Sequence, residues 1–160
     1  SPLSEAASAH AIAGAVISEM LPDTCYLIGA GTTTRSIMER LALPNTLIGV
    51  DMICNRSLVE SDVYGERILS LAEGRPLKLI LTVTGGQGFL LGRGNQQLTP
   101  AVLQKIGKEN IIVVATQMKM AALGGRALRL DTGSAALDRQ LSGYYRVITG
   151  YEQYTVAKAE

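Results

Sequence analysis

Four short runs of almost entirely apolar residues constrain the fold of this chain more than any other feature. They read CYLIG at 25–29, TLIGV at 46–50, LKLILTV at 77–83 and NIIVVAT at 110–116. A strand with one solvated face alternates apolar and polar residues, whereas strands buried on both faces form near-continuous apolar runs. Segments with helical periodicity separate the four runs. This alternation predicts a parallel sheet that is covered by helices.

The remaining elements follow from periodicity and from capping residues. Thr99 and Pro100 predict a helix start, and Gly107 predicts its end. Further helices are expected at 5–20, 32–43, 61–73, 117–123 and 134–143, and further strands at 127–131, 145–150 and 151–157. The sequence therefore predicts a single α/β domain over 1–160, with three layers, a mostly parallel open sheet and helices on both faces. Residues 1–8 are interpreted as a linker or a cloning remnant.

Composition excludes several classes of function. The formal net charge is +1, without a charge block at either end, which argues against a nucleic-acid surface. The chain has no Trp and one Phe, so it lacks platforms for stacking bases. No apolar run reaches the roughly 20 residues of a membrane span. Cys25 and Cys54 are not part of a His/Cys cluster, so we expect no metal site and a reduced, cytoplasmic protein.

The segment GAGTTT at 29–34 joins the first predicted strand to a helix. In open α/β sheets, ligands bind beyond the carboxyl ends of the strands, which is where this segment lies. Gly29 and Gly31 permit a tight turn, while Thr32, Thr33 and Thr34 bring hydroxyl and backbone N–H groups to a helix N-terminus. Such a terminus suits a phosphate or a carboxylate. The alternative is a capped strand–helix turn without a ligand.

Two other residues extend the candidate site at this edge of the sheet. Asp51 follows the run at 46–50, twenty positions after Gly31, where a dinucleotide-binding fold places a ribose-binding acid. That match is incomplete, because Thr34 stands where the dinucleotide fingerprint has its third glycine, and strands often end in Asp. Lys119, after the run at 110–116, could reach an anion or could be a solvated side chain.

The stretch TGGQGFLLGRGNQQ at 84–97 is the longest loop that the sequence predicts beyond a strand. Successive glycine N–H groups can converge on an anion, an arginine can bind it with two bonds, and amide side chains can bind hydroxyl groups. The binding candidates here are Gly85, Gly86, Gly88, Arg93, Gly94 and Asn95. The alternatives are a structural Ω-loop and a subunit interface.

Catalytic residues cannot be assigned from the sequence. The one histidine, His10, lies on a predicted alanine-rich helix without an acid or cysteine partner, so no nucleophile–histidine set can be built. The question of whether the chain is itself an enzyme therefore stays open.

Several segments together resemble a family of bacterial and archaeal ATP-NAD kinase-like proteins related to AcoX. They are LIGAGTTTRSIMERL, LIGVDMI, GGQGFLLGRGNQQLTPAVLQKIGKENIIVVAT, LDTG and YYRVITGYEQ, and they cover about residues 24–155. The resemblance is to the C-terminal domain of that family. It implies phosphoryl transfer from ATP or polyphosphate to NAD, with Mg²⁺ in the parent enzyme. The family's catalytic Gly-Gly-Asp-Gly motif belongs to an N-terminal domain, and GGQG at 85–88 has Gln87 in place of the aspartate.

The resemblance implies a domain that binds a nucleotide or phosphate ligand, NAD or ATP, and that is inactive without its N-terminal kinase domain. No permanently bound cofactor is expected, and a homo-oligomer is one expected form. The threonine turn also resembles the phosphate loop of ribose-5-phosphate isomerase-like proteins. The sheet is therefore expected to be Rossmann-like or ribose-5-phosphate-isomerase-like, and a sugar-phosphate isomerase or sensor module, or an assembly domain, remains the alternative function.

Overall fold

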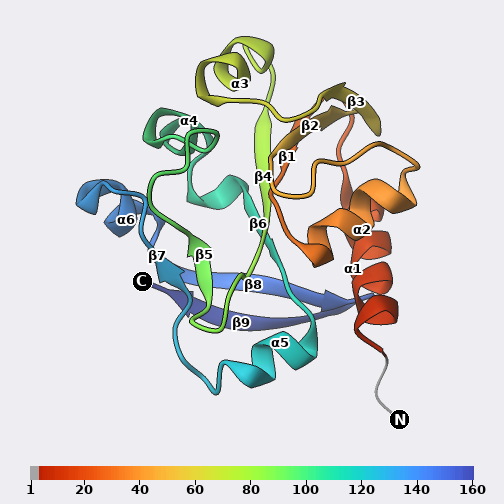
Figure 1. The fold of residues 1–160 in the computed structure, drawn as a ribbon, viewed down its shortest axis with the longest axis vertical. Coiled ribbons are helices and arrows are strands. Elements are labelled where there is room, and N and C mark those ends of the chain that lie inside the picture. The colour runs from red at the N-terminus through yellow and green to blue at the C-terminus, as the bar shows by residue number, and fades with distance from the viewer. Residues whose placement is uncertain (1–3) are drawn as a thin grey trace.

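A computed structural model describes residues 4–160 and shows a seven-stranded sheet in the order β3-β2-β1-β4-β6-β8-β9 (Figure 1). The strands are β1 (Cys25–Ile28), β2 (Asp51–Cys54), β3 (Ser57–Glu60), β4 (Leu77–Thr82), β6 (Ile111–Val114), β8 (Gly143–Gly150) and β9 (Gln153–Ala159). The central strands β1, β4, β6 and β8 are parallel. At the two edges, β2, β3 and β9 run antiparallel to their neighbours. The predicted α/β fold with a mostly parallel open sheet is confirmed.

Helices cover both faces of this sheet. They are α1 (Glu5–Glu19), α2 (Thr32–Arg40), α3 (Gly65–Leu71), α4 (Pro100–Ile106), α5 (Gln117–Ala122) and α6 (Ala135–Leu141), with a 3₁₀ turn η1 at Lys108–Asn110. A small parallel sheet of β5 (Phe89–Leu91) and β7 (Arg129–Leu130) completes the fold. As expected, Thr99 caps α4, which ends at Gly107.

The three layers arise because successive side chains of a strand point to opposite faces. In β1, Leu27 belongs to the core shared with α3, α4, α6 and the small sheet, whereas Ile28 belongs to the core shared with α1 and α2. Ile68 of α3 and Ile37 of α2 are fully buried in these two cores. Both faces of the central strands are therefore apolar, which is why their sequences do not alternate.

The second predicted strand, at 46–50, is wrong. These residues form an irregular loop, and β2 begins after them, at Asp51. β2 and β3 form a hairpin whose turn residues Asn55 and Arg56 both have positive φ, at 51° and 62°. The sequence did not predict β3, and the helix expected at 61–73 is shortened to α3, because the chain leaves this hairpin only after Glu60.

The first helix begins earlier than the interpretation of residues 1–8 as a linker implies. Ser4 caps α1, so residues 5–8, which the sequence assigned to a linker, are helical; residues 1–3 lie outside the described part of the chain.

Cys25 and Cys54 are buried, free and directly opposite each other on β1 and β2. Burial raises the pKa of the Cys25 thiol, so it stays protonated. No helix in residues 4–160 is long and apolar enough to cross a membrane.

Candidate functional site

A polar cleft of about 240 Å³ opens where the central parallel strands end. The registers Ile28↔Ile80 and Thr82↔Val114 bring the carboxyl ends of β1, β4 and β6 to one edge of the sheet. The cleft is lined by Glu5, Gly31, Thr32, Thr33, Thr82, Val83, Thr84, Gly85, Thr116 and Lys119. It therefore lies at the edge where an open α/β sheet is expected to bind its ligand.

The threonine turn forms one wall of this cleft. Gly31 has φ +144°, and a Cβ there would approach Cγ2 of Thr82 more closely than 3.0 Å, so only glycine fits. No side chain caps the first turn of α2, whose Thr32 and Thr33 line the cleft. Helix N-terminal N–H groups lack an acceptor within the helix and carry the positive end of its dipole. This wall can therefore donate hydrogen bonds to an anion.

Lys119 of α5 also lines the cleft. Its Nζ donates a hydrogen bond to the carbonyl of Gly85 at 2.9 Å, which holds the exposed ammonium group beside another residue of the cleft lining. Thr116 caps α5 by accepting from the N–H of Lys119 at 3.2 Å. A cation and a set of helix N–H groups thus face the same space from different elements.

Glu5 adds a carboxylate to the same cleft. Oγ1 of Thr116 donates to Oε2 of Glu5 at 2.9 Å, which ties the first turn of α1 to the loop after β6. The cleft therefore offers hydrogen-bond donors, one of them the cationic Lys119, and one anionic acceptor, the carboxylate of Glu5. Such a lining suits a ligand that carries both an anionic group and a hydroxyl or amino donor.

The glycine-rich loop divides into two parts, and only the first reaches the cleft. Residues 85–88 form the turn of a short hairpin, in which Thr84 and Phe89 exchange backbone hydrogen bonds at 2.9 and 3.0 Å. Gly85 lines the cleft. Gly88 donates its N–H to the carbonyl of Gly85, and the carbonyl of Gly86 accepts from Arg126. The turn therefore presents its carbonyl groups to nearby cations.

The second part of the loop makes structural contacts away from the cleft lining. Arg93 pairs with Asp131 through two hydrogen bonds at 3.1 and 3.0 Å, in an exposed position. Asn95 accepts from the N–H groups of residues 97 and 98, as the side chain of an Asx turn does, and Gly94 precedes it with φ +77°. These three candidates do not share the cleft with Thr32 and Thr33.

Asp51 belongs neither to the cleft lining nor to the glycine-rich loop. It is buried, and its carboxylate accepts from the N–H and hydroxyl of Thr46, at 2.8 and 2.7 Å, and from the N–H of Asp62 at 2.8 Å. Through these three hydrogen bonds Asp51 holds together the loops at 46–50 and 61–62. Nearby, Gly29 continues β1 by donating to the carbonyl of Ile80 at 2.9 Å.

Three threonines and one acid in the lining escaped the sequence-based reasoning. Thr82 ends β4, and Thr84 and Thr116 follow β4 and β6 at the predicted ligand edge, so the strand pattern could have identified them. Glu5 comes from α1, which precedes the first strand, and nothing in the local sequence relates it to the others. Thr34 is fully buried, and its hydroxyl donates to the carbonyl of Gly31. This bond stabilises the turn from the protein interior.

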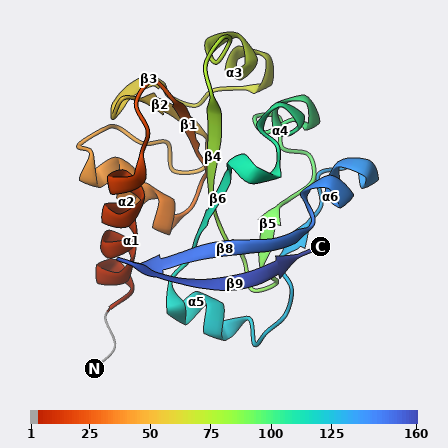
Figure 2. The same cartoon turned by 180° about the vertical axis from the view of Figure 1, so that it is seen from behind.

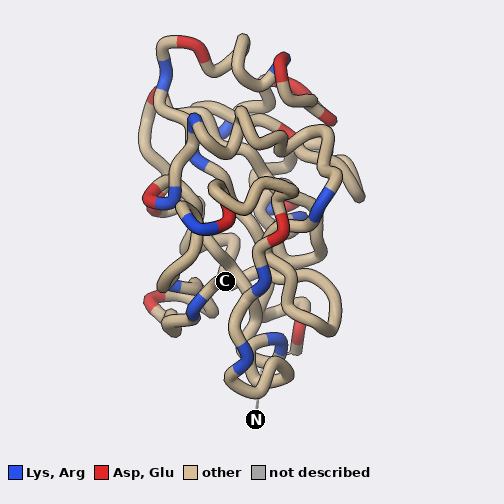
Figure 3. The backbone as a smooth tube through the Cα atoms, turned by 90° about the vertical axis from the view of Figure 1, so that its left-hand side faces the viewer, with Lys and Arg blue, Asp and Glu red and all other residues tan. Residues whose placement is uncertain are grey.

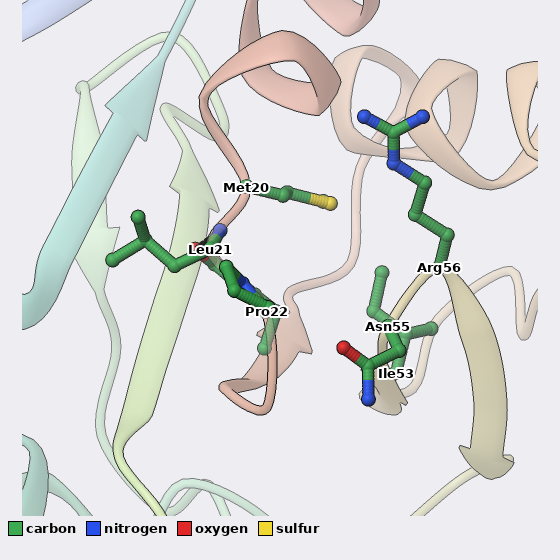
Figure 4. Close-up of a pocket in the computed structure, with 7 residues that line it drawn as sticks. Met20, Leu21, Pro22, Ile53, Asn55 and Arg56 are labelled. Atoms are coloured by element: carbon green, nitrogen blue, oxygen red, sulfur yellow. Dashed lines mark hydrogen bonds between the residues drawn. The ribbon is translucent and has the colours of Figure 1, made fainter.

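A second pocket, of about 230 Å³, lies at the opposite end of β1 (Figure 4). Its lining is mostly apolar: Met20, Leu21, Pro22, Tyr26, Ile53, Asn55 and Arg56. The guanidinium group of Arg56 donates to the carbonyl of Ile17 at 3.3 Å, and therefore caps the end of α1. This pocket offers no converging donors, so the polar cleft is the better candidate for an anionic ligand.

Charge elsewhere adds no competing site. Figure 3 shows acidic and basic residues spread over the whole backbone trace. Among residues 4–160 there is no group of three or more His, Cys, Asp or Glu side chains that could hold a metal ion. The polar cleft is thus the place where the described residues gather groups suited to binding.

Comparison with known proteins assigns the chain to a family. The sequence model of the ATP-NAD kinase C-terminal domain matches residues 35–159, which include the glycine-rich loop and the cleft residues at and after the ends of β4 and β6, but not Glu5 or the threonine turn. No curated protein and no solved structure matches the chain. The resemblance found in the sequence is confirmed, and the chain belongs to the ATP-NAD kinase C-terminal domain family.

Proposed function

We propose that the polar cleft binds a phosphate group of a nucleotide, NAD or ATP, and that the chain serves as the ligand-binding C-terminal domain of an NAD kinase-like phosphotransferase. One observation carries the proposal: the uncapped first turn of α2 and the ammonium group of Lys119 face the same cleft. Helix N–H groups and a cation are the donors that bind phosphate most often in α/β proteins.

Glu5 supports an organic phosphate over inorganic phosphate. A carboxylate repels a free anion, but it accepts hydrogen bonds from hydroxyl groups. A nucleotide or sugar phosphate can place its phosphate at the threonine turn and a hydroxyl group near Glu5. The family membership favours NAD or ATP as that ligand.

The chain's own residues do not supply phosphoryl-transfer chemistry in this proposal. The turn sequence GGQG at 85–88 has Gln87 in place of the aspartate of a Gly-Gly-Asp-Gly motif, and Oε1 of Gln87 accepts from Arg129 at 2.9 Å. Mg²⁺ is not assigned to this chain, because residues 4–160 hold no cluster of three metal ligands. The catalytic groups would come from an N-terminal kinase domain, and the isolated chain would be inactive.

A second function is favoured by one specific observation. Lys119 and Glu5 both line the cleft, so a base and an acid stand over the ends of the parallel strands beside the threonine turn. A sugar-phosphate isomerase or sensor would need groups of this kind there. The choice of ligands in the binding experiment separates this function from the first.

The experiment is thermal unfolding of the 160-residue chain with ATP, NAD, NADP, polyphosphate, ribose 5-phosphate and inorganic phosphate. A ligand present at about 100 times its Kd adds roughly 2.7 kcal/mol, which corresponds to about 5–10 °C in Tm for a domain of this size. A shift with NAD or ATP supports the first function, and a shift with ribose 5-phosphate alone supports the second. No shift with any ligand leaves the chain as an assembly domain.

Matched variants locate the site. Thr32→Pro removes one N–H at the first helical position, where proline is tolerated, whereas Thr32→Ala removes only the hydroxyl group. We expect Thr32→Pro and Lys119→Gln to reduce the shift, and Thr32→Ala and Lys105→Gln, an exposed change on α4, to preserve it. Arg93→Ala should also preserve it. If Thr32→Pro and Lys119→Gln both bind like the unmodified chain, the cleft is not the site.

A further inference from the structure

The outer strand of the main sheet, β9, has an open edge. Only β8 pairs with it in the sheet, because the strand order of the described residues ends at β9. Its last residues are covered from the other side: Leu128 donates to the carbonyl of Lys158 at 2.8 Å and accepts from the N–H of Glu160 at 2.9 Å. The open stretch therefore lies before Lys158.

Those two bonds fix which backbone groups point outward. The carbonyl of Lys158 points away from β8, and backbone direction alternates along an antiparallel strand. The N–H and C=O groups of Tyr154 and Val156 therefore also point outward, while those of Thr155 point toward β8. Within residues 4–160 no other backbone group bonds to these outward groups, so the edge offers two residues with donors and acceptors for pairing.

Three side chains beside this edge are largely apolar and exposed, and Arg146 lies over the ring of one of them, Tyr154, at 4.7 Å. Tyr144, Tyr154 and Val156 have 67%, 58% and 65% of their surface exposed. The pairs Tyr144↔Lys158 and Arg146↔Val156 place them on one face of the hairpin. Figure 2 shows β8 and β9 from the side on which no helix crosses in front of them. Natural edge strands usually carry charges or prolines that prevent pairing. In β9 the one charged residue, Lys158, lies after the open stretch, so Tyr154–Val156 carry neither.

We propose that β9 pairs antiparallel with β9 of a second copy of this chain, about a two-fold axis at Thr155. In this register Tyr154 of each copy faces Val156 of the other, and both residues exchange N–H···O bonds. Moving the register toward the C-terminus would require the carbonyl of Lys158, which Leu128 already occupies. Moving it toward the N-terminus would require Glu152, which has φ +52° in the turn.

The same register makes the side chains complementary to themselves, which is the reason for choosing a second copy as the occupant. Tyr154 meets a valine across the axis, a favourable aromatic and β-branched pair. Beyond the paired residues, the side chain of Lys158, which contacts Glu160 of its own chain at 3.7 Å, comes near the Glu152 carboxylate in the turn of the other copy, so opposite charges approach each other. A groove of about 560 Å³ beside β9, lined in part by Met120, Arg126 and Val156, leaves room for the added strand. One strand pair buries less surface than a permanent interface, so the dimer is concentration-dependent.

Sedimentation velocity of the 160-residue chain, from about 10 μM to about 1 mM, measures this equilibrium. Val156→Pro removes the outward N–H without touching the bonds to β8, and a proline facing out from an edge strand is tolerated. Val156→Thr keeps the N–H and the branched shape, and it is the matched control. We expect the control to dimerise normally and Val156→Pro to weaken dimerisation about thirtyfold, because each copy loses one bond.

A charge exchange provides an independent measurement. Lys158→Glu and Glu152→Lys should each weaken the dimer by roughly threefold to tenfold, and the double variant should recover most of the loss. If circular dichroism shows that Val156→Pro does not fold, this exchange decides alone. A chain that stays monomeric over the whole range overturns the proposal. The proposal is also overturned if Val156→Pro and the charge variants dimerise as strongly as the unmodified chain.

Discussion

Replacement of Gly31 by alanine tests the geometry on which the candidate site depends. Gly31 turns the chain from β1 into α2 with φ +144° and ψ 162°, a region of backbone space that is essentially restricted to glycine. A Cβ at this position also approaches Cγ2 of Thr82 more closely than 3.0 Å, and Thr82 is buried at the end of β4. Alanine therefore meets two penalties at once: backbone strain and a steric clash.

The two penalties can be given approximate sizes. A residue other than glycine in such a conformation costs on the order of 1–3 kcal/mol. Forcing one extra carbon into a packed site costs typically about 1–3 kcal/mol more. We therefore expect Gly31→Ala to lower the free energy of unfolding by about 3–4 kcal/mol. For a domain of this size, that corresponds to a fall in Tm of roughly 6–16 °C.

Urea unfolding of the variant, followed by circular dichroism, measures the loss. Gly74→Ala is the matched control, because Gly74 has φ +76° but a Cβ there meets nothing within 4 Å. It should lose only about 1 kcal/mol. Thr82→Ser removes the clashing methyl group, so the double variant Gly31→Ala/Thr82→Ser should be more stable than the sum of the single changes predicts. Equal losses for Gly31→Ala and Gly74→Ala, or strict additivity in the double variant, would refute the reasoning.

Two further predictions concern groups outside the cleft. Asp51→Asn should lower the free energy of unfolding by about 3 kcal/mol in chemical denaturation, because the buried carboxylate accepts from Thr46 and Asp62 and an amide cannot accept all of these bonds. Burial raises the pKa of Tyr145 to about 12, while its hydroxyl donates to the carbonyl of Leu141 at 2.6 Å. The folded state holds this proton to higher pH than the unfolded chain, so the free energy of unfolding should fall as the pH rises from about 10 toward 12. Tyr145→Phe should be less stable at neutral pH and show a flatter decline, and an identical decline would contradict the assignment.

The sequence was most informative where burial is complete. The runs that became β1, β4 and β6 are apolar on both faces, so their lack of alternation revealed the central parallel strands correctly. It failed at 46–50, where an equally apolar run forms a loop. There Asp51 binds the loop through its carboxylate, and Ile48 is 89% exposed. Local hydrophobicity cannot reveal which apolar runs will find a partner strand.

The site shows the same division between local and distant information. The threonine turn and Gly85 were both predicted from their position after strands, and the structure brings them to one cleft. Arg93 was assigned to the same site because it follows Gly85 in sequence. Its actual partner is Asp131, at the start of a loop almost forty residues later, and no property of the glycine-rich stretch indicates that pairing.

The density of glycines therefore says less about binding than the ends of the strands do. Gly85 and Gly88 have positive φ, at 69° and 75°, because a tight hairpin must reverse between Thr84 and Phe89. Turning the chain is sufficient reason for glycine there, and the carbonyl of Gly85 is occupied by Lys119. The groups free to bind an anion come instead from a helix that starts directly after a parallel strand. In a sheet of this kind the loops diverge where parallel strands end, so the space between them and the helix N–H groups arise from the same topology.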